Sequence, residues 1–258
     1  MVILLNDLLS ILAKALFYLL AVLLLMSCKE NLVEPTVSTP KQKCPESDTI
    51  KTIPMPDTTS EEKTYKILAL GDSYTIGESV SASERYPNQL ADSLRQRGFD
   101  IDTVQIIAQT GWRTDDLDRA ITAANIEGVY DLVFLLIGVN NFYQRGNVEA
   151  YKPEFTGLLN RALGYAGNKK ENVIVVSIPD YGYTPFGRNN QPTISKGIDS
   201  FNSANKAISE LAQVSYVNIT DISREGFRDP SLVANDGLHP SGKMYSLWVE
   251  RILPIIKK

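Results

Sequence analysis

The stretch Leu132-Val133-Phe134-Leu135-Leu136-Ile137, which follows Asp131 and runs into Gly138-Val139-Asn140, decides the fold of this chain. Residues 132–137 are all apolar, with no polar residue between them. A strand has this pattern when both faces of its sheet are covered, because neither face meets water. The stretch therefore predicts a strand over residues 131–137 inside a covered sheet.

Strand and helix patterns alternate on both sides of this strand. Pro87 and Gly98 mark the two ends of the first predicted helix, and Thr114 is the expected N-cap of the second. The predicted strands cover residues 65–70, 101–108, 131–137, 172–178 and 215–219, and the predicted helices cover residues 83–97, 114–125, 149–165, 195–213 and 241–252. This alternation predicts an α/β fold with a parallel, flavodoxin-like sheet between two helical layers, formed by one domain over residues 64–258.

Four short segments fall where such a fold builds its sites. Gly71-Asp72-Ser73, Gly111 and Gly138-Val139-Asn140 each follow a predicted strand, and Asp236 to His239 precede the last predicted helix. Sites of open parallel sheets lie beyond the carboxyl ends of the strands. We therefore expect these four segments, far apart in the sequence, to meet at one edge of the sheet.

The residue types in these segments suit nucleophilic catalysis. A serine hydroxyl such as that of Ser73 needs a base, and His239 is the only histidine in the chain. The imidazole in turn needs a carboxylate that fixes its tautomer. Asp236 lies three residues before His239 and is the preferred partner, while Asp221, which follows a predicted strand, is the alternative.

The four segments together resemble the SGNH, or GDSL, hydrolase family. The resemblance covers the domain from about residue 66 to residue 253 and rests on four blocks in order, which are Gly71-Asp72-Ser73-Tyr74-Thr75, Gln109-Thr110-Gly111, Gly138-Val139-Asn140-Asn141 and Asp236-Gly237-Leu238-His239-Pro240. It implies a serine esterase or acylhydrolase that forms an acyl-enzyme on its serine. Each block alone is a weak signal, because a Gly-Asp-Ser tripeptide is commonly just a turn.

The resemblance also implies a role for each site residue. Ser73 would be the nucleophile, His239 the base and Asp236 the orienting acid. The backbone N–H groups of Ser73 and Gly111 and the side-chain amide of Asn140 would stabilise the oxyanion. No cofactor is expected.

Two residues depart from the family pattern. Tyr74 stands where the family usually has a smaller aliphatic residue, and Asn141 stands where it usually has aspartate. The first departure is expected to reshape the floor of the pocket, and the second to remove a buttressing carboxylate. Neither removes a catalytic group.

The substrate and the exact reaction stay open at this level. A small-molecule or glycan-linked ester is the expected substrate, and the absence of a long amphipathic lid favours small acyl groups. The same acyl-enzyme also suits acyl transfer to an alcohol, and a non-catalytic surface lipoprotein that binds glycan or lipid is the alternative from another class. The loop over residues 181–188 is either an ordered surface loop or a wall of the pocket.

Composition excludes two further classes of function. Lys and Arg number 26 and Asp and Glu number 30, so the net charge of −4 gives no basic excess for nucleic-acid binding. A single histidine and the absence of a Cys-x-x-Cys pair leave no recognisable set of metal ligands.

The N-terminus reads as a targeting segment. An apolar run over residues 15–26 follows Lys14 and ends in Leu25-Met26-Ser27-Cys28, which resembles a bacterial lipobox. Residues 1–27 are therefore a predicted lipoprotein signal peptide, Cys28 a predicted lipidation site and residues 28–63 a flexible membrane tether. An uncleaved anchor helix over residues 2–26 is the alternative, and a bridge from Cys28 to Cys44 is open only without lipidation. Both main interpretations place the domain in the bacterial cell envelope, anchored to a membrane.

Overall fold

The computed structural model describes residues 63–258. The predicted signal peptide, the lipidation site Cys28 and residues 29–62 of the predicted tether lie outside the described residues. Within residues 63–258, no helix combines the length and the apolar character that a membrane crossing requires.

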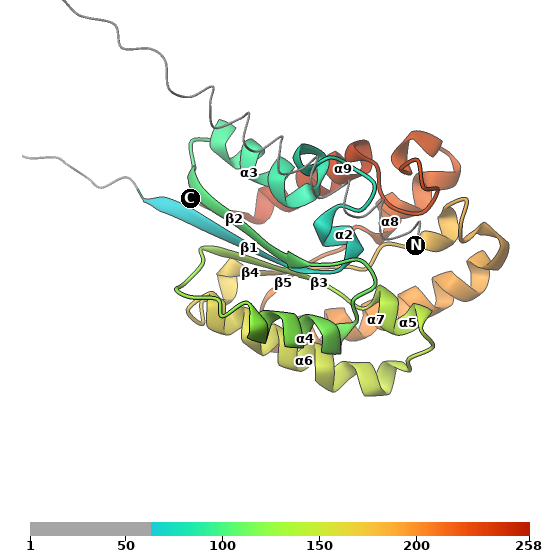
Figure 1. The fold of residues 1–258 in the computed structure, drawn as a ribbon, viewed down its shortest axis with the longest axis horizontal. Helices are drawn as coiled ribbons and strands as arrows, with labels where there is room; N and C mark the ends of the chain where they lie inside the picture. The colour runs from blue at the N-terminus through green and yellow to red at the C-terminus, as the bar shows by residue number, and fades with distance from the viewer. Residues whose placement is uncertain (1–62) are drawn as a thin grey trace, which may run out of the picture. The chain divides into compact units, whose positions relative to one another are not determined.

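One parallel sheet of five strands organises the described part of the chain, in the spatial order β2-β1-β3-β4-β5 (Figure 1). The strands are β1 (Thr64–Gly71), β2 (Asp100–Ala108), β3 (Leu132–Leu136), β4 (Val173–Val176) and β5 (Ser215–Val217). This is the flavodoxin-like order, in which the direction of chain progression reverses beside β1. The predicted sheet is confirmed, and each predicted strand agrees with the observed one to within two residues at either end.

Two helical layers cover the sheet (Figure 1). The helices α3 (Tyr86–Gln96) and α9 (Gly242–Ile252) pack together on one face. On the other face, α6 (Val148–Tyr165) contacts both α4 (Thr114–Ala123) and α7 (Gln191–Ala212). The predicted three-layer α/β/α architecture is therefore confirmed.

The core explains the unbroken apolar pattern of the central strand. All five residues of β3 are buried. On one face of the sheet, Phe134 lies 6.2 Å from the ring of Tyr86, which also contacts Tyr245 and Trp248 of α9. This burial on both faces holds the carboxyl ends of the strands, and the loops that leave them, in fixed positions.

The structure differs from the prediction mainly in short elements. The helices α2 (Ser73–Ile76), α5 (Val139–Tyr143) and α8 (Thr220–Ser223) were not predicted, because they are too short to show a helical period. Helix α7 begins at Gln191, four residues before the expected start, since a proline is tolerated in the first turn of a helix. Arg113, not Thr114, is the N-cap of α4, and Thr114 is its first residue.

Candidate active site

The four predicted segments meet around one cavity of about 170 Å³. Ser73, Gly111, Asn140 and His239 all line it. Ser73 begins α2 after β1, Gly111 follows β2, Asn140 lies in α5 after β3, and His239 precedes α9. The cavity thus lies beyond the carboxyl ends of β1, β2 and β3, next to the reversal of strand order where sheets of this kind bind ligands.

The turn that carries Ser73 is tightly built. The carboxylate of Asp72 accepts a hydrogen bond from the N–H of Tyr74 at 3.0 Å and caps α2. Only glycine fits at position 71, because a Cβ atom there would collide with Thr75 Oγ1 and with the carbonyl oxygen of Leu136. Asp72 is fully buried and does not line the cavity, and this burial raises its pKa to about 7.

Asp236 and His239 form a close pair. His239 Nδ1 lies 2.6 Å from Asp236 Oδ2, while Asp236 Oδ1 accepts hydrogen bonds from the N–H groups of Leu238 at 2.9 Å and His239 at 3.0 Å. Burial by itself would raise the pKa of Asp236, but the hydrogen bonds from His239, Ser79 and the two backbone N–H groups outweigh it and hold that pKa well below its usual range. The carboxylate is therefore ionised and acts only as an acceptor, so Nδ1 carries a proton and Nε2 is left as the accepting nitrogen.

The alternative acid is engaged elsewhere. Asp221 lies in the first turn of α8 and pairs with Arg251 of α9. Of the two candidate acids, Asp236 is the one that touches the histidine.

Ser79 is a contact of the site that the sequence did not reveal. Its Oγ donates to Asp236 Oδ2 at 2.7 Å, so this oxygen accepts both from the serine and from the imidazole. Ser79 adopts a φ of 67°, which is uncommon for a residue other than glycine. The neighbouring Glu78 accepts a hydrogen bond from Thr110, which also lines the cavity.

The predicted oxyanion side is held by side-chain amides. Asn140 Nδ2 donates to the carbonyl oxygen of Trp112 at 2.9 Å, and Gln144 Nε2 donates to that of Gly111 at 3.3 Å. An amide nitrogen carries two N–H bonds, so Asn140 keeps one for a ligand. Gly111 has a φ of 87°, a backbone conformation that favours glycine.

Both departures from the family pattern have structural consequences. Asn141 is buried, accepts from the N–H of Thr114 at 3.1 Å and donates to Thr114 Oγ1 at 2.6 Å, while Glu154 also contacts Thr114 Oγ1. Position 141 itself carries no carboxylate, and the carboxylate of Glu154 lies beside this amide and contacts the same threonine. Tyr74 lines the cavity and its ring centroid lies 5.5 Å from that of His239.

The loop over residues 181–188 contributes to the wall of the cavity. Tyr181 and Phe186 line it, together with Tyr143 of α5. Of the two interpretations of this loop, the structure agrees with the pocket wall. Within residues 63–258, no group of three or more metal-ligating side chains is close enough together to hold a metal ion.

Comparisons with known proteins identify the family of this chain. The model of the "GDSL-like Lipase/Acylhydrolase family" matches residues 69–247. The uncharacterized protein YpmR of Bacillus subtilis (strain 168) is 25% identical over 209 residues, which cover 74% of this chain and 81% of YpmR.

Two solved structures have the same fold. That of TesA is similar with a TM-score of 0.60 at 17% sequence identity, covering 74% of this chain and 98% of TesA. That of Axe2, an acetylxylan esterase from Geobacillus stearothermophilus, is similar with a TM-score of 0.60 at 18% identity, covering 75% of this chain and 94% of Axe2.

Proposed function

Since the chain belongs to the GDSL-like lipase/acylhydrolase family of ester hydrolases, we propose that it cleaves carboxylic esters through an acyl-enzyme on Ser73. The observation that carries the proposal is the hydrogen-bonded pair of Asp236 and His239, whose imidazole lines the same cavity as Ser73, Gly111 and Asn140. Nucleophile, base, orienting acid and oxyanion donors are then available in one place.

The first half-reaction forms the acyl-enzyme. Nε2 of His239 takes the proton of Ser73 as Oγ attacks the ester carbonyl carbon, and the carbonyl oxygen becomes an oxyanion. The N–H groups of Ser73 and Gly111 and the amide of Asn140 donate to that oxyanion. The carbon–oxygen bond to the alcohol then breaks as His239 returns the proton to the leaving oxygen.

The second half-reaction releases the acid. Water attacks the acyl carbon while His239 takes one of its protons, and the bond between the carbon and Ser73 Oγ breaks as that oxygen regains a proton. Throughout the cycle the ionised Asp236 holds the imidazole in one tautomer and stabilises its charged form. No cofactor takes part in these steps.

The size of the cavity supports a short acyl group. Its volume is about 170 Å³. A buried cavity of similar volume, about 150 Å³, accommodates one benzene molecule. The ester group and a few acyl carbons would therefore fill the space beside Ser73.

Labelling with a fluorophosphonate tests the proposal. The reagent phosphonylates serines that an adjacent base activates, so we expect one adduct, on Ser73, identified by mass spectrometry of peptides. Ser73→Ala should abolish labelling, whereas Ser83→Ala, a matched change at another serine, should retain it. An adduct on a different serine, or no adduct on a folded protein, would contradict the mechanism.

We also propose that the enzyme is a lipoprotein of the bacterial cell envelope, anchored through Cys28. The support is the apolar run that ends in Leu25-Met26-Ser27-Cys28. Acyl chains on the cysteine would tether the domain to a membrane on its periplasmic or surface side.

A further inference from the structure

A second cavity lies next to the catalytic cavity. Its volume is about 600 Å³. Three of its lining residues, Tyr143, Tyr181 and Phe186, also line the catalytic cavity, so the two spaces share an aromatic wall. A group bound at Ser73 can therefore extend along these rings into the second cavity.

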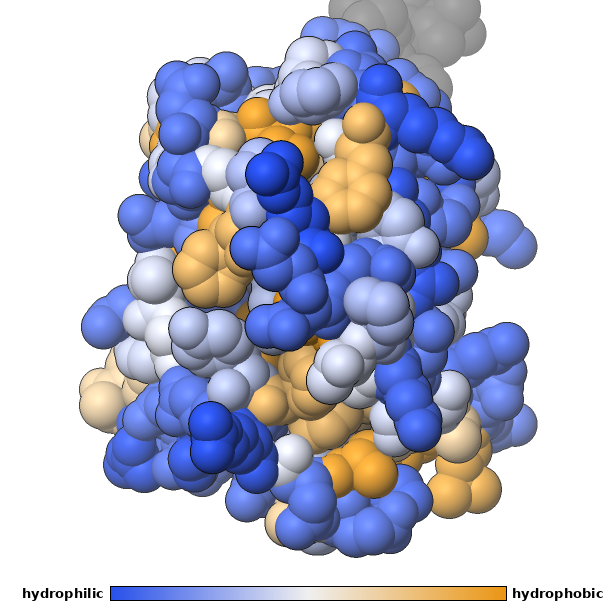
Figure 2. All heavy atoms as spheres, turned by 90° about the vertical axis from the view of Figure 1, so that its right-hand side faces the viewer, coloured by the Kyte–Doolittle hydropathy of each residue, from blue (hydrophilic) through white to orange (hydrophobic). Residues whose placement is uncertain are grey.

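Two of the three aromatic side chains of the shared wall are exposed to solvent. The three ring centroids lie 6.1 to 6.3 Å apart. Tyr143 is 56% and Phe186 54% exposed. Figure 2, which faces the carboxyl ends of the strands, shows apolar side chains exposed among hydrophilic ones on this side of the molecule. Clustered aromatic rings exposed beside a site indicate a surface that a ligand covers.

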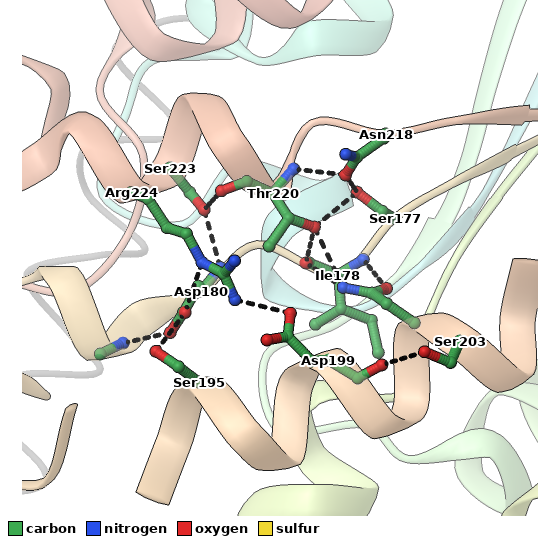
Figure 3. Close-up of polar contacts among 12 residues, drawn as sticks. Ser177, Ile178, Asp180, Ser195, Asp199, Ser203, Asn218, Thr220, Ser223 and Arg224 are labelled. Carbon is green, nitrogen blue, oxygen red and sulfur yellow. Dashed lines mark hydrogen bonds and ion pairs between the residues drawn. The ribbon is translucent and has the colours of Figure 1, made fainter. Parts of the chain in front are cut away.

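A buried polar network surrounds Asp180, the residue directly before Tyr181 of the wall (Figure 3). The fully buried carboxylate of Asp180, directly before Tyr181, accepts hydrogen bonds from Ser195 Oγ at 2.6 Å and from Arg224 Nε at 2.9 Å. The N–H of Asp180 donates to Ser223 Oγ at 2.8 Å. Helix α7 and the segment after β5 are thus both joined to the backbone beside Tyr181, which fixes the position of this ring before any ligand arrives.

The wall contacts the loop that carries His239. The N–H of Phe186 donates to the carbonyl oxygen of Gly237 at 3.0 Å, which joins the wall to the loop that carries His239. His239 returns its proton to the alcohol oxygen of the ester, so the alcohol leaves on the histidine side. In the proposed mechanism, the second cavity is then the space into which the alcohol extends.

The remaining lining of the second cavity is mixed, with the apolar side chains of Phe142 and Ile194, two glycines and three polar side chains. The three polar residues, Arg145, Asn190 and Thr193, contribute hydrogen-bond donors and acceptors to the same cavity as the aromatic wall. An alkyl chain would strip water from these groups without replacing its hydrogen bonds, which is unfavourable. A pyranose ring offers both surfaces that the cavity requires, since its C–H faces pack on aromatic rings and its hydroxyl groups bond to polar side chains.

We propose that the second cavity binds a pyranose ring of a saccharide, and that the enzyme's substrate is a short-chain ester of that saccharide. This proposal rests on the proposed function of the catalytic cavity. It concerns the alcohol half of the substrate, which the catalytic residues do not determine.

Three acetates that share one acyl group test the proposal. These are the monoacetates of methyl glucopyranoside as a positional mixture, butyl acetate and octyl acetate, with acetate release measured at low substrate concentration. We expect the wild-type enzyme to have its highest kcat/KM on the pyranoside. Arg145→Ala and Asn190→Ala should each lower the ratio of pyranoside to butyl activity about fivefold, as the loss of one hydrogen bond would.

The control is an exposed ring that lines neither cavity. Phe227 is 47% exposed and stacks on Tyr183. Phe227→Ala should leave the ratio unchanged. Saturation-transfer NMR of unacetylated methyl glucopyranoside on the Ser73→Ala protein should show contact with the sugar, and Asn190→Ala added to that protein should reduce it.

The outcomes separate the two proposals. Equal or better hydrolysis of octyl acetate, with ratios that the variants do not alter, would overturn the saccharide site and leave the esterase intact. Sugar contact in the NMR experiment without hydrolysis of any acetate would support the saccharide site and overturn the proposed catalysis.

Discussion

Removal of the Ser79 hydroxyl should lower catalysis without unfolding the protein. Asp236 Oδ2 accepts from His239 Nδ1 at 2.6 Å and from Ser79 Oγ at 2.7 Å. Two donors on one oxygen fix the direction in which the carboxylate faces the imidazole. Without Ser79 the carboxylate keeps its hydrogen bonds to the imidazole and to two backbone N–H groups, so it stays ionised but is less constrained.

The magnitude follows from the type and the exposure of this hydrogen bond. Hydrogen bonds to charged groups contribute about 1.5–3 kcal/mol, and Ser79 is exposed, so water replaces part of the lost interaction. The substitution should therefore remove about 1 kcal/mol of transition-state stabilisation, which corresponds to about a fivefold fall in kcat. KM should stay near its wild-type value, because Ser79 does not line the cavity.

Two substitutions separate the hydroxyl from the backbone. Ser79 has a φ of 67°, so Ser79→Gly relieves conformational strain whereas Ser79→Ala retains it. Both should lower kcat for p-nitrophenyl acetate to a similar extent, while only the glycine variant should hold or raise the urea midpoint. Ser83→Ala is the matched control. Wild-type kcat in both variants, or an activity loss that follows the unfolded fraction, would refute the reasoning.

Four further predictions concern other groups. Asn140→Ala should lower kcat about 10²–10³-fold with little change in KM, measured by steady-state kinetics, because it removes an oxyanion donor. Activity should be lost on acidification, since only the neutral imidazole of His239 accepts the serine proton, and a rise in kcat/KM as the pH is lowered would contradict it. Burial raises the pKa of Asp72 from 3.8 to about 7, so the folded state binds the proton more tightly and stability falls as pH rises through this window. Asp72→Asn should therefore stabilise the protein at pH 8, by at most about 4 kcal/mol, and less at pH 5, measured by urea unfolding. Cys28→Ser should abolish lipidation and Cys44→Ser should not, and mass spectrometry of the membrane fraction would contradict this if the mature chain began at Met1 with Cys28 unmodified.

The parts of the fold that could be predicted have strong local patterns. The central strand over residues 132–136 is buried on both faces, which is the condition that removes polar residues from its sequence. The pair of Asp236 and His239 was also predictable, because only two residues separate them and a tight turn brings the two side chains together. In both cases the physical constraint acts within a few residues.

The short helices and the supporting contacts leave no such pattern. Helix α5 carries Asn140 and the exposed ring of Tyr143, yet it spans only Val139–Tyr143 and shows no helical period. Ser79 meets Asp236 across 157 residues of sequence. Asp180 and Arg224, which secure the aromatic wall, likewise come from loops whose approach depends on the whole sheet.

The conformation of the loop after α2 gives a reason for its sequence. Gly77 and Ser79 have φ values of 73° and 67°, and these two bends turn the chain back over the carboxyl edge of the sheet. Glu78, which lies between them, accepts a hydrogen bond from Thr110, and Ser79 donates one to Asp236. One loop therefore contacts both the predicted oxyanion side and the acid side of the site. A non-glycine residue at positive φ is unfavourable by about 1 kcal/mol or more, and such residues persist where the surrounding structure uses them. Glycine would remove the strain at position 79 but also the hydroxyl, so the serine there is explained by its contact with Asp236 and not by the turn. In the proposed mechanism, the blocks that mark the family thus supply the reacting groups, while the alignment of those groups depends on loop residues outside the blocks.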